Sequence, residues 1–147
     1  MPGGASGAFA DAGFWIALLD DQDPLNGRAS ALARQQPPLN IVTSEMVLVE
    51  VFNHFSRSGP QGRLAVDSFV RKLRLTDDVD VVPQSSEQFW AAAARYAERP
   101  DQRWILTDCV SFLVMESRGI DEALAYDRDF VQAGFRALLR DESRSAQ

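Results

Sequence analysis

The sequence predicts a three-layer α/β/α fold around a central parallel sheet of about five strands, and three observations support this prediction. Short apolar segments, rich in β-branched or aromatic residues, alternate with longer segments of helical periodicity. Ser44 precedes an apolar run as a helix N-cap does, and Gly119 stands where a helix C-terminus favours a positive φ. A chain of 147 residues has the length for one ordinary core but not for two.

Each predicted element follows from its own pattern. The predicted strands are Ala8–Ala10, Leu39–Val42, Val79–Val82, Ala123–Tyr126 and Phe135–Leu139. The predicted helices are Ala12–Leu19, Leu25–Arg34, Ser44–Ser56, Gln61–Leu73, Ser86–Glu98 and Thr107–Arg118. Ser86 and Thr107 are expected to open their helices as Ser44 does. Strands that alternate with helices pair in parallel, which gives the predicted sheet.

The chain is expected to comprise a flexible leader at 1–7, a single domain at 8–140 and a polar tail at 141–147. No apolar run approaches the roughly 20 residues of a membrane-spanning helix, and Met1–Gly7 lacks both a basic start and an apolar signal core. Cys109 is the only cysteine, which excludes an internal disulfide and a cysteine-rich zinc site. We therefore expect a cytoplasmic protein that does not bind membranes.

The formal net charge of −6 argues against a surface that binds nucleic acid through bulk electrostatics. This objection weakens if some of the acidic groups converge to hold cations, because a divalent ion reverses the local field that a phosphate meets. The positions of the carboxylates therefore decide more than their number.

Three aspartates stand beside predicted strand or helix ends. Asp11 follows the first strand, Asp127 follows the fourth, and Asp108 lies in the first turn of a helix, where the macrodipole favours an anion. In open α/β sheets, ligands bind at the carboxyl ends of the strands. Taken singly, each residue is as well explained as a loop, turn or first-turn charge. Their joint placement favours a functional site.

Glu50 is the fourth acid. It interrupts the run Met46–Phe52, which is apolar on every face of a helix, so Glu50 is expected to be largely buried. A buried carboxylate is costly unless it is paired, protonated or coordinated. Coordination of a hard cation, shared with acids from other segments, is the simplest resolution. The alternative is a surface glutamate on a solvated strip.

Four ordered segments carry a resemblance to a known family. Phe9–Leu19 resembles the opening of PIN domains, in which the first catalytic Asp follows strand one. Thr43–Val51 resembles the second motif, Leu106–Phe112 the third and Ala123–Phe130 the fourth. The resemblance extends over residues 9–139 and is strongest to the VapC-like toxins of type II toxin–antitoxin systems.

The resemblance implies a PIN-like fold and a metal-dependent endoribonuclease. It implies a Mg²⁺ site, with Mn²⁺ as a substitute, formed chiefly by Asp11 and Asp108 and completed by Glu50 and Asp127. RNA phosphodiester bonds would then be hydrolysed by a water that the metal activates. The resemblance further implies a homodimer and a cognate antitoxin protein that inhibits the nuclease.

The chain departs from the family pattern at three positions. Ala12 follows Asp11 where relatives commonly carry Thr or Ser, so a hydroxyl that helps to orient the first carboxylate is missing. Asn26 stands where a His is frequent, and Cys109 replaces a common small residue. All four acids are present, so we expect these differences to affect rate or substrate rather than competence.

Three neighbouring residues have open roles. Thr107 is either a helix cap or a group that orients Asp108 or a metal-bound water. Asp129 is either a further acid that supports the metal ligands or a turn charge. Arg128 either contacts a substrate phosphate or is simply solvated.

Aromatic side chains and the single histidine are more simply explained by structure than by chemistry. His54 lies one turn after Glu50 and is expected to be structural or merely exposed. Trp15, Trp90 and Trp104 can stack on bases, but aromatic residues at helical spacing usually belong to the core. Cys109 is expected to be a small buried residue rather than a nucleophile.

Two other classes of protein were weighed. A receiver-like phosphorylation module also gathers carboxylates at strand ends, but it needs a lysine after a late strand, and the only lysine, Lys72, lies mid-helix. The second alternative is a catalytically silent PIN-like domain that binds protein or RNA. Metal-dependent RNA cleavage discriminates that alternative from the nuclease.

Overall fold

Five parallel strands form the centre of the structure in the order β3-β2-β1-β4-β5. The computed structural model describes residues 7–140, so the polar tail and all of the expected leader except Gly7 lie outside the described residues. The strands are β1 (Gly7–Ala10), β2 (Asn40–Ser44), β3 (Val79–Val82), β4 (Glu122–Leu124) and β5 (Arg136–Ala137). Phe9 of β1 lies opposite Val42 of β2 on one side and Ala123 of β4 on the other.

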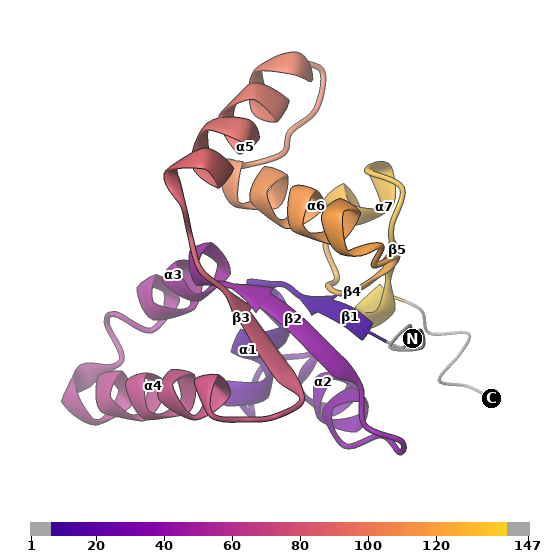
Figure 1. Ribbon diagram of the computed structural model, residues 1–147. Helices are drawn as coiled ribbons and strands as arrows, with labels where there is room; N and C mark the ends of the chain where they lie inside the picture. The colour runs from indigo at the N-terminus through magenta and orange to yellow at the C-terminus, as the bar shows by residue number, and fades with distance from the viewer. Residues whose placement is uncertain (1–6, 141–147) are drawn as a thin grey trace.

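Helices cover both faces of this sheet, which confirms the predicted three layers. They are α1 (Ala12–Leu19), α2 (Asn26–Ala33), α3 (Glu45–His54), α4 (Gly59–Arg74), α5 (Ser86–Glu98), α6 (Leu106–Arg118), α7 (Arg128–Gln132) and the 3-10 helix η2 (Leu138–Arg140). Figure 1 shows α1, α2 and α4 on one face of the sheet and α6 and α7 on the other, with α5 packed on the outer side of α6. Among residues 7–140, no helix has both the length and the apolar character to cross a bilayer.

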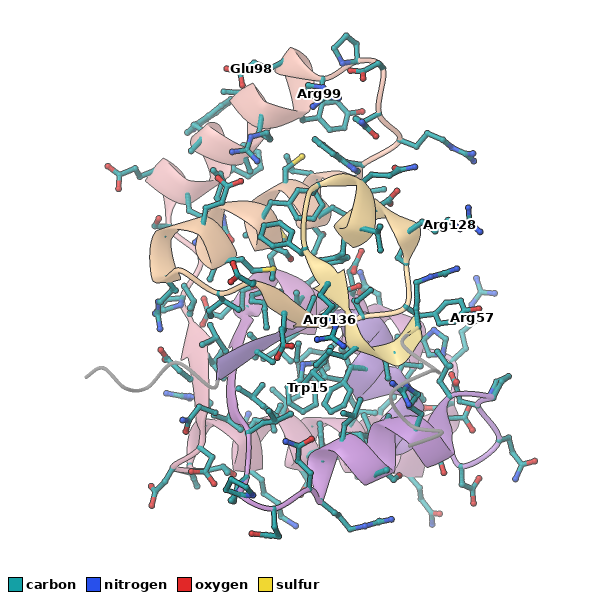
Figure 2. The ribbon with its side chains drawn as sticks, turned by 90° about the vertical axis from the view of Figure 1, so that its right-hand side faces the viewer. Trp15, Arg57, Glu98, Arg99, Arg128 and Arg136 are labelled. Carbon is teal, nitrogen blue, oxygen red and sulfur yellow. The ribbon has the colours of Figure 1, made fainter. Side chains whose placement is uncertain are left out.

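The core lies on both sides of β1. In β1, the residues Ala8, Phe9 and Ala10 are completely buried, as expected for a parallel strand with both faces covered. Above the sheet, the ring of Phe112 packs edge-on against Trp104 at 5.0 Å and Phe130 at 5.2 Å. On the other face, Trp15 is almost completely buried, and Figure 2 shows it in the interior of the molecule.

Several predicted boundaries are wrong near the C-terminus. The fourth strand ends at Leu124 rather than Tyr126, and the fifth is only Arg136–Ala137 because η2 follows it directly. Helix α7 was not predicted, since five residues with one buried side chain show no helical periodicity. The Asp127 carboxylate accepts the Asp129 N–H at 3.0 Å, which starts this helix between the two strands.

The predicted helix starts are partly confirmed. The Ser44 hydroxyl accepts the Val47 N–H at 3.1 Å, and Gly119 has φ 65° in the left-handed region. Ser86 and Thr107 are not caps: Ser85 accepts the Gln88 N–H at 3.0 Å, and Ile105 is the N-cap residue of α6.

Candidate active site

The sheet order places a switch point between β1 and β4. From β1 the chain builds outward through β2 and β3 and then returns to the opposite side of β1. Ligand sites of open α/β sheets lie at the carboxyl ends of strands beside such a point. Asp11 follows β1 and Asp127 lies just beyond β4, and the Asp11 N–H donates to the Leu124 carbonyl at 3.2 Å. Both carboxylates therefore leave the same edge of the sheet.

Helices α3 and α6 bring the other two acids to this edge. Asp108 lies buried in the first turn of α6, where its Oδ2 accepts the Ile105 N–H at 3.2 Å. Glu50 lies in the middle of α3, and its carboxylate is hydrogen-bonded to the hydroxyl of Thr107 on α6. Thr107 thus positions Glu50, a role that neither of its expected alternatives included.

The acids line one open hollow of about 840 Å³, which we call the acidic hollow. Its carboxylates are Asp11, Glu50, Asp108, Asp127 and Asp129. All four acids singled out in the sequence therefore lie in the same place. Asp129 joins them through a hydrogen bond to Asp108, so it is more than a charge in a turn.

A buried threonine supports the end of β1. The Thr43 hydroxyl donates to the Ala10 carbonyl at 2.9 Å and accepts the indole N–H of Trp15 at 3.1 Å. These bonds join β2, β1 and α1 immediately before Asp11. This supporting role of Thr43 was not predicted, because a single threonine in a strand gives no signal of hydrogen bonds to two other elements.

Burial and mutual repulsion raise the pKa of the two central aspartates. Burial raises the pKa of Asp11 to about 7, against a hydrogen bond from the Ala12 N–H and together with repulsion from Glu50 and Asp127. Burial, the charge of Asp11 and the hydrogen bond with Asp129 raise the pKa of Asp108 to about 8. A nearby cation would therefore relieve a large electrostatic cost.

The pKa values of Glu50 and Asp129, which also line the acidic hollow, are raised by the same cause. Burial raises the pKa of Glu50, whereas the hydrogen bond from Thr107 lowers it. Burial also raises the pKa of Asp129, and the hydrogen bond with Asp108 lowers it.

The donor chemistry fits a hard divalent cation. Within residues 7–140, no group of three or more His, Cys, Asp or Glu side chains is arranged to hold a metal ion. Mg²⁺ does not need one, since it is usually held by one or two carboxylates, several waters and substrate phosphates. Asp11 and Asp108, whose charges repel each other, supply such a pair of oxygen donors.

Arginines surround the carboxylates. Arg103, Arg128 and Arg140 also line the acidic hollow, and we call them the arginine rim. Within residues 7–140, neither Arg103 nor Arg128 donates a hydrogen bond, whereas Arg140 donates to the Tyr126 carbonyl at 2.8 Å. Figure 2 shows Arg128 projecting outward on the same side of the molecule as Arg57.

The arginine rim weakens the objection raised by the net charge of −6. It places three guanidinium groups beside the five carboxylates of the acidic hollow, so a cation held by the carboxylates would leave positive charge for a phosphate at the mouth. Arg128 was singled out in the sequence, but Arg103 and Arg140 were missed. They come from the loop before α6 and from η2, neither of which was predicted as part of a site.

Helix α3 is less buried than predicted. Val49 is 49% and Phe52 40% exposed, so the expectation of an apolar helix buried on every face is wrong. Glu50 is accordingly only partly buried, at the boundary between the packed face and the hollow. The sequence could not reveal that α3 lies at the edge of the sheet, packed against α1, α4 and α6 but uncovered elsewhere.

The remaining expectations are mostly confirmed. Trp15, Trp104 and Cys109 are buried, but Trp90 is 68% exposed and does not belong to the core. His54 is exposed, packs edge-on against Phe55 at 4.8 Å and does not line the acidic hollow.

Two of the departures from the family pattern, Ala12 and Asn26, have structural counterparts. With no hydroxyl at Ala12, it is the backbone N–H of this residue that hydrogen-bonds to the Asp11 carboxylate. The Asn26 side chain donates to the Ala17 carbonyl at 2.8 Å and so joins α2 to α1.

The family model of the PIN domain matches residues 8–136. The chain belongs to the PIN-domain family. This PIN domain is 32% identical, over 127 residues, to the 23S rRNA-specific endonuclease VapC20 from two strains of Mycobacterium tuberculosis, a match that covers 86% of this chain and 94% of the relative. The crystal structure of Mycobacterium tuberculosis VapC20, described as a sarcin–ricin loop cleaving toxin, superposes with a TM-score of 0.77 at 31% identity. That match covers 88% of this PIN domain and 96% of the other chain.

Proposed function

We propose that this PIN domain is a metal-dependent endoribonuclease and the toxin of a toxin–antitoxin pair. The observation that carries the proposal is the convergence of Asp11, Glu50, Asp108 and Asp127 in one hollow with arginines around its mouth. Carboxylates are suited to a divalent cation and guanidinium groups to phosphate, so the two together suit phosphodiester hydrolysis. The relatives named as rRNA endonucleases support the same conclusion.

The residues of the acidic hollow have different roles in the proposed reaction. Asp11 and Asp108 would hold Mg²⁺ or Mn²⁺, and Glu50 and Asp127 would complete the site. When bound, the cation polarises the scissile phosphate and lowers the pKa of the attacking water. Thr107 holds the Glu50 carboxylate through its hydroxyl, and Asp129 holds Asp108 through their shared hydrogen bond.

The arginine rim positions the RNA. Arg103 and Arg128 have donors available for substrate phosphates on either side of the cut, since neither donates a hydrogen bond within residues 7–140. No side chain acts as a nucleophile in this scheme: Cys109 is buried and His54 lies outside the acidic hollow.

We propose the sarcin–ricin loop of 23S rRNA as the substrate, by analogy with the relatives, and the cytoplasm as the place of action. The test is incubation of intact ribosomes with the purified chain, followed by primer extension across 23S rRNA. One new stop within the loop, absent in EDTA, supports this substrate. Cuts spread over many unpaired regions would contradict it.

The toxin proposal includes a cognate antitoxin and a homodimer. Expression of the chain alone should arrest growth, and co-expression of the neighbouring gene should restore it. Light scattering of the purified chain should give twice the mass of 16.3 kDa. Growth without a defect, or a defect that no neighbour rescues, would count against the toxin reading.

The second candidate is a silent PIN-like domain that binds protein or RNA. Burial and neighbouring acids raise the pKa of Asp11 and of Asp108, which lowers the stability of the metal-free fold at neutral pH, so the presence of these residues favours a working metal site over a silent one. RNA binding without metal-dependent cutting on any RNA would favour the silent domain.

A further inference from the structure

A second hollow of about 780 Å³ adjoins the acidic hollow, between the end of α5 and the start of α6. Tyr96, Arg99 and Trp104 line it together with Arg103 and Ile105. Arg103 and Ile105 line the acidic hollow as well, so the two hollows adjoin at these residues. We call the second space the aromatic hollow.

Its walls offer rings to a flat ligand. Tyr96, on the last turn of α5, is 56% exposed, and Ile105 is half exposed. The Trp104 ring is buried and fixed edge-on against Phe112 at a centroid distance of 5.0 Å. An exposed aromatic ring such as that of Tyr96, beside a nuclease site, is suited to stacking on an unpaired base.

The two arginines of the aromatic hollow differ in their pairing. The Arg99 guanidinium donates twice to Asp101, at 3.0 and 2.9 Å, and lies 5.3 Å from the centroid of the Trp104 ring. Its charge is therefore largely compensated. Arg103 donates no hydrogen bond within residues 7–140 and stands where the two hollows meet, so it is the cation available to a phosphate there.

The indole N–H of Trp104 adds a second, independent observation. Its Nε1 is buried and has no hydrogen-bond acceptor among residues 7–140. The other buried indole, that of Trp15, donates to Thr43, so the fold satisfies one of the two and not the other. A buried donor without a partner costs the fold stability, and this donor belongs to a side chain that forms part of the wall of the hollow.

We propose that the aromatic hollow binds an unpaired nucleobase next to the scissile phosphate. The base stacks on Tyr96, and Arg103, which stands where the two hollows meet, pairs with a phosphate of the same strand. The inference rests on the proposed RNA cleavage and restricts the substrate to RNA whose nucleotide beside the cut is unpaired. Proteins read RNA sequence chiefly at such splayed bases.

The test is a coupling measurement between protein and RNA. Two proteins are compared: the double variant Asp11→Asn/Asp108→Asn, expected not to cut, and the same double variant that also carries Tyr96→Ala. Each protein is titrated with a synthetic sarcin–ricin stem–loop. The loop is made in versions with one abasic nucleotide at each position. We expect one abasic position to weaken binding about tenfold when Tyr96 is present and to have almost no effect in Tyr96→Ala.

Arg103→Gln should act differently from Tyr96→Ala. It should weaken binding of every RNA version to a similar extent and reduce the salt dependence by about one phosphate contact. Trp90→Ala, an exposed aromatic on the same helix that lines neither hollow, and Arg71→Gln on α4 are the matched controls. Both should bind as the parent does.

The outcomes separate this inference from the proposed function. No abasic position coupled to Tyr96 would overturn it, even if the wild-type chain cuts the loop. Coupling without cutting by the wild type would support the base site and contradict the nuclease. If Tyr96→Ala weakens inhibition by the antitoxin but leaves RNA binding unchanged, the hollow is a protein-docking surface and the inference is wrong.

Discussion

Asp11 and Asp108 show the conflict between stability and function at the scale of single residues. Both lie where burial and neighbouring acids penalise the charged form. A protein selected only for stability would have no reason to place them there. The unfavourable free energy of ionising both aspartates is explained if a cation that is bound together with the substrate cancels it.

This cost predicts a pH dependence of stability in the metal-free protein. The folded pKa values of about 7 for Asp11 and about 8 for Asp108 lie above the unfolded value of 3.8. The folded state therefore binds more protons between about pH 4 and pH 8, so the free energy of unfolding falls as the pH rises through this window. Melting temperatures in EDTA from pH 5 to pH 8.5 measure the slope.

Asp11→Asn/Asp108→Asn is the control for this slope. With both groups neutral at every pH, the melting temperature should vary less than that of the wild type and should exceed it by a few degrees at pH 8. Equal slopes for the two proteins would show that other groups cause the dependence.

Thr107 is predicted to act through Glu50. Thr107→Val removes the hydroxyl that lowers the Glu50 pKa, so this carboxyl should ionise only at higher pH and lose its fixed orientation. We expect single-turnover cleavage to fall about tenfold and its rise with pH to shift upward. Ser117→Ala removes a hydroxyl on the same helix, bonded to the Val114 carbonyl, and should leave both unchanged. A uniform loss of rate without a shift would assign Thr107 a packing role.

At the scale of elements, segments with a clear helical period or a β-branched apolar run could be predicted, and the short helices near the C-terminus could not. The position of α5 was predicted exactly as the structure has it, Ser86–Glu98, because helical periodicity accumulates over its length. Helix α7 and the 3-10 helix after β5 are too short to show a period, and both carry rim arginines. The four acids were found because three stand at the end of a predicted strand or the start of a predicted helix and Glu50 interrupts an apolar run. Arg103, Arg140 and Thr43 were missed because their roles depend on contacts between distant segments.

The N-caps of α3 and α5 are predicted to differ in strength. Ser44 is completely buried and caps the Val47 N–H in the interior, whereas Ser85 is exposed and caps Gln88 near solvent. In Ser44→Ala the freed N–H finds no water, so we expect a loss of about 2 kcal/mol, against about 0.5–1 kcal/mol for Ser85→Ala. Urea unfolding of both variants measures the difference. Equal losses would contradict the importance of burial for this cap.

At the scale of the whole molecule, metal binding and folding should be linked. A cation that binds the ionised acids of the folded state raises the melting temperature, and more so at pH 8 than at pH 5, where protons compete for Asp11 and Asp108. Thermal unfolding with Mn²⁺ or Mg²⁺ at both pH values measures this linkage. The same increase at both pH values, or an increase that persists in Asp11→Asn/Asp108→Asn, would place the cation elsewhere.

The most direct measurement is cleavage of a panel of structured RNAs with Mg²⁺, Mn²⁺ or EDTA. It compares the wild type, Asp11→Asn/Asp108→Asn and, as a control, Asp121→Asn, an exposed carboxylate that does not line the acidic hollow. The account predicts cutting by the wild type and Asp121→Asn with either metal, none in EDTA, and at least a hundredfold loss in the double variant. Cutting that survives in EDTA or in the double variant would contradict the acidic hollow as the catalytic centre.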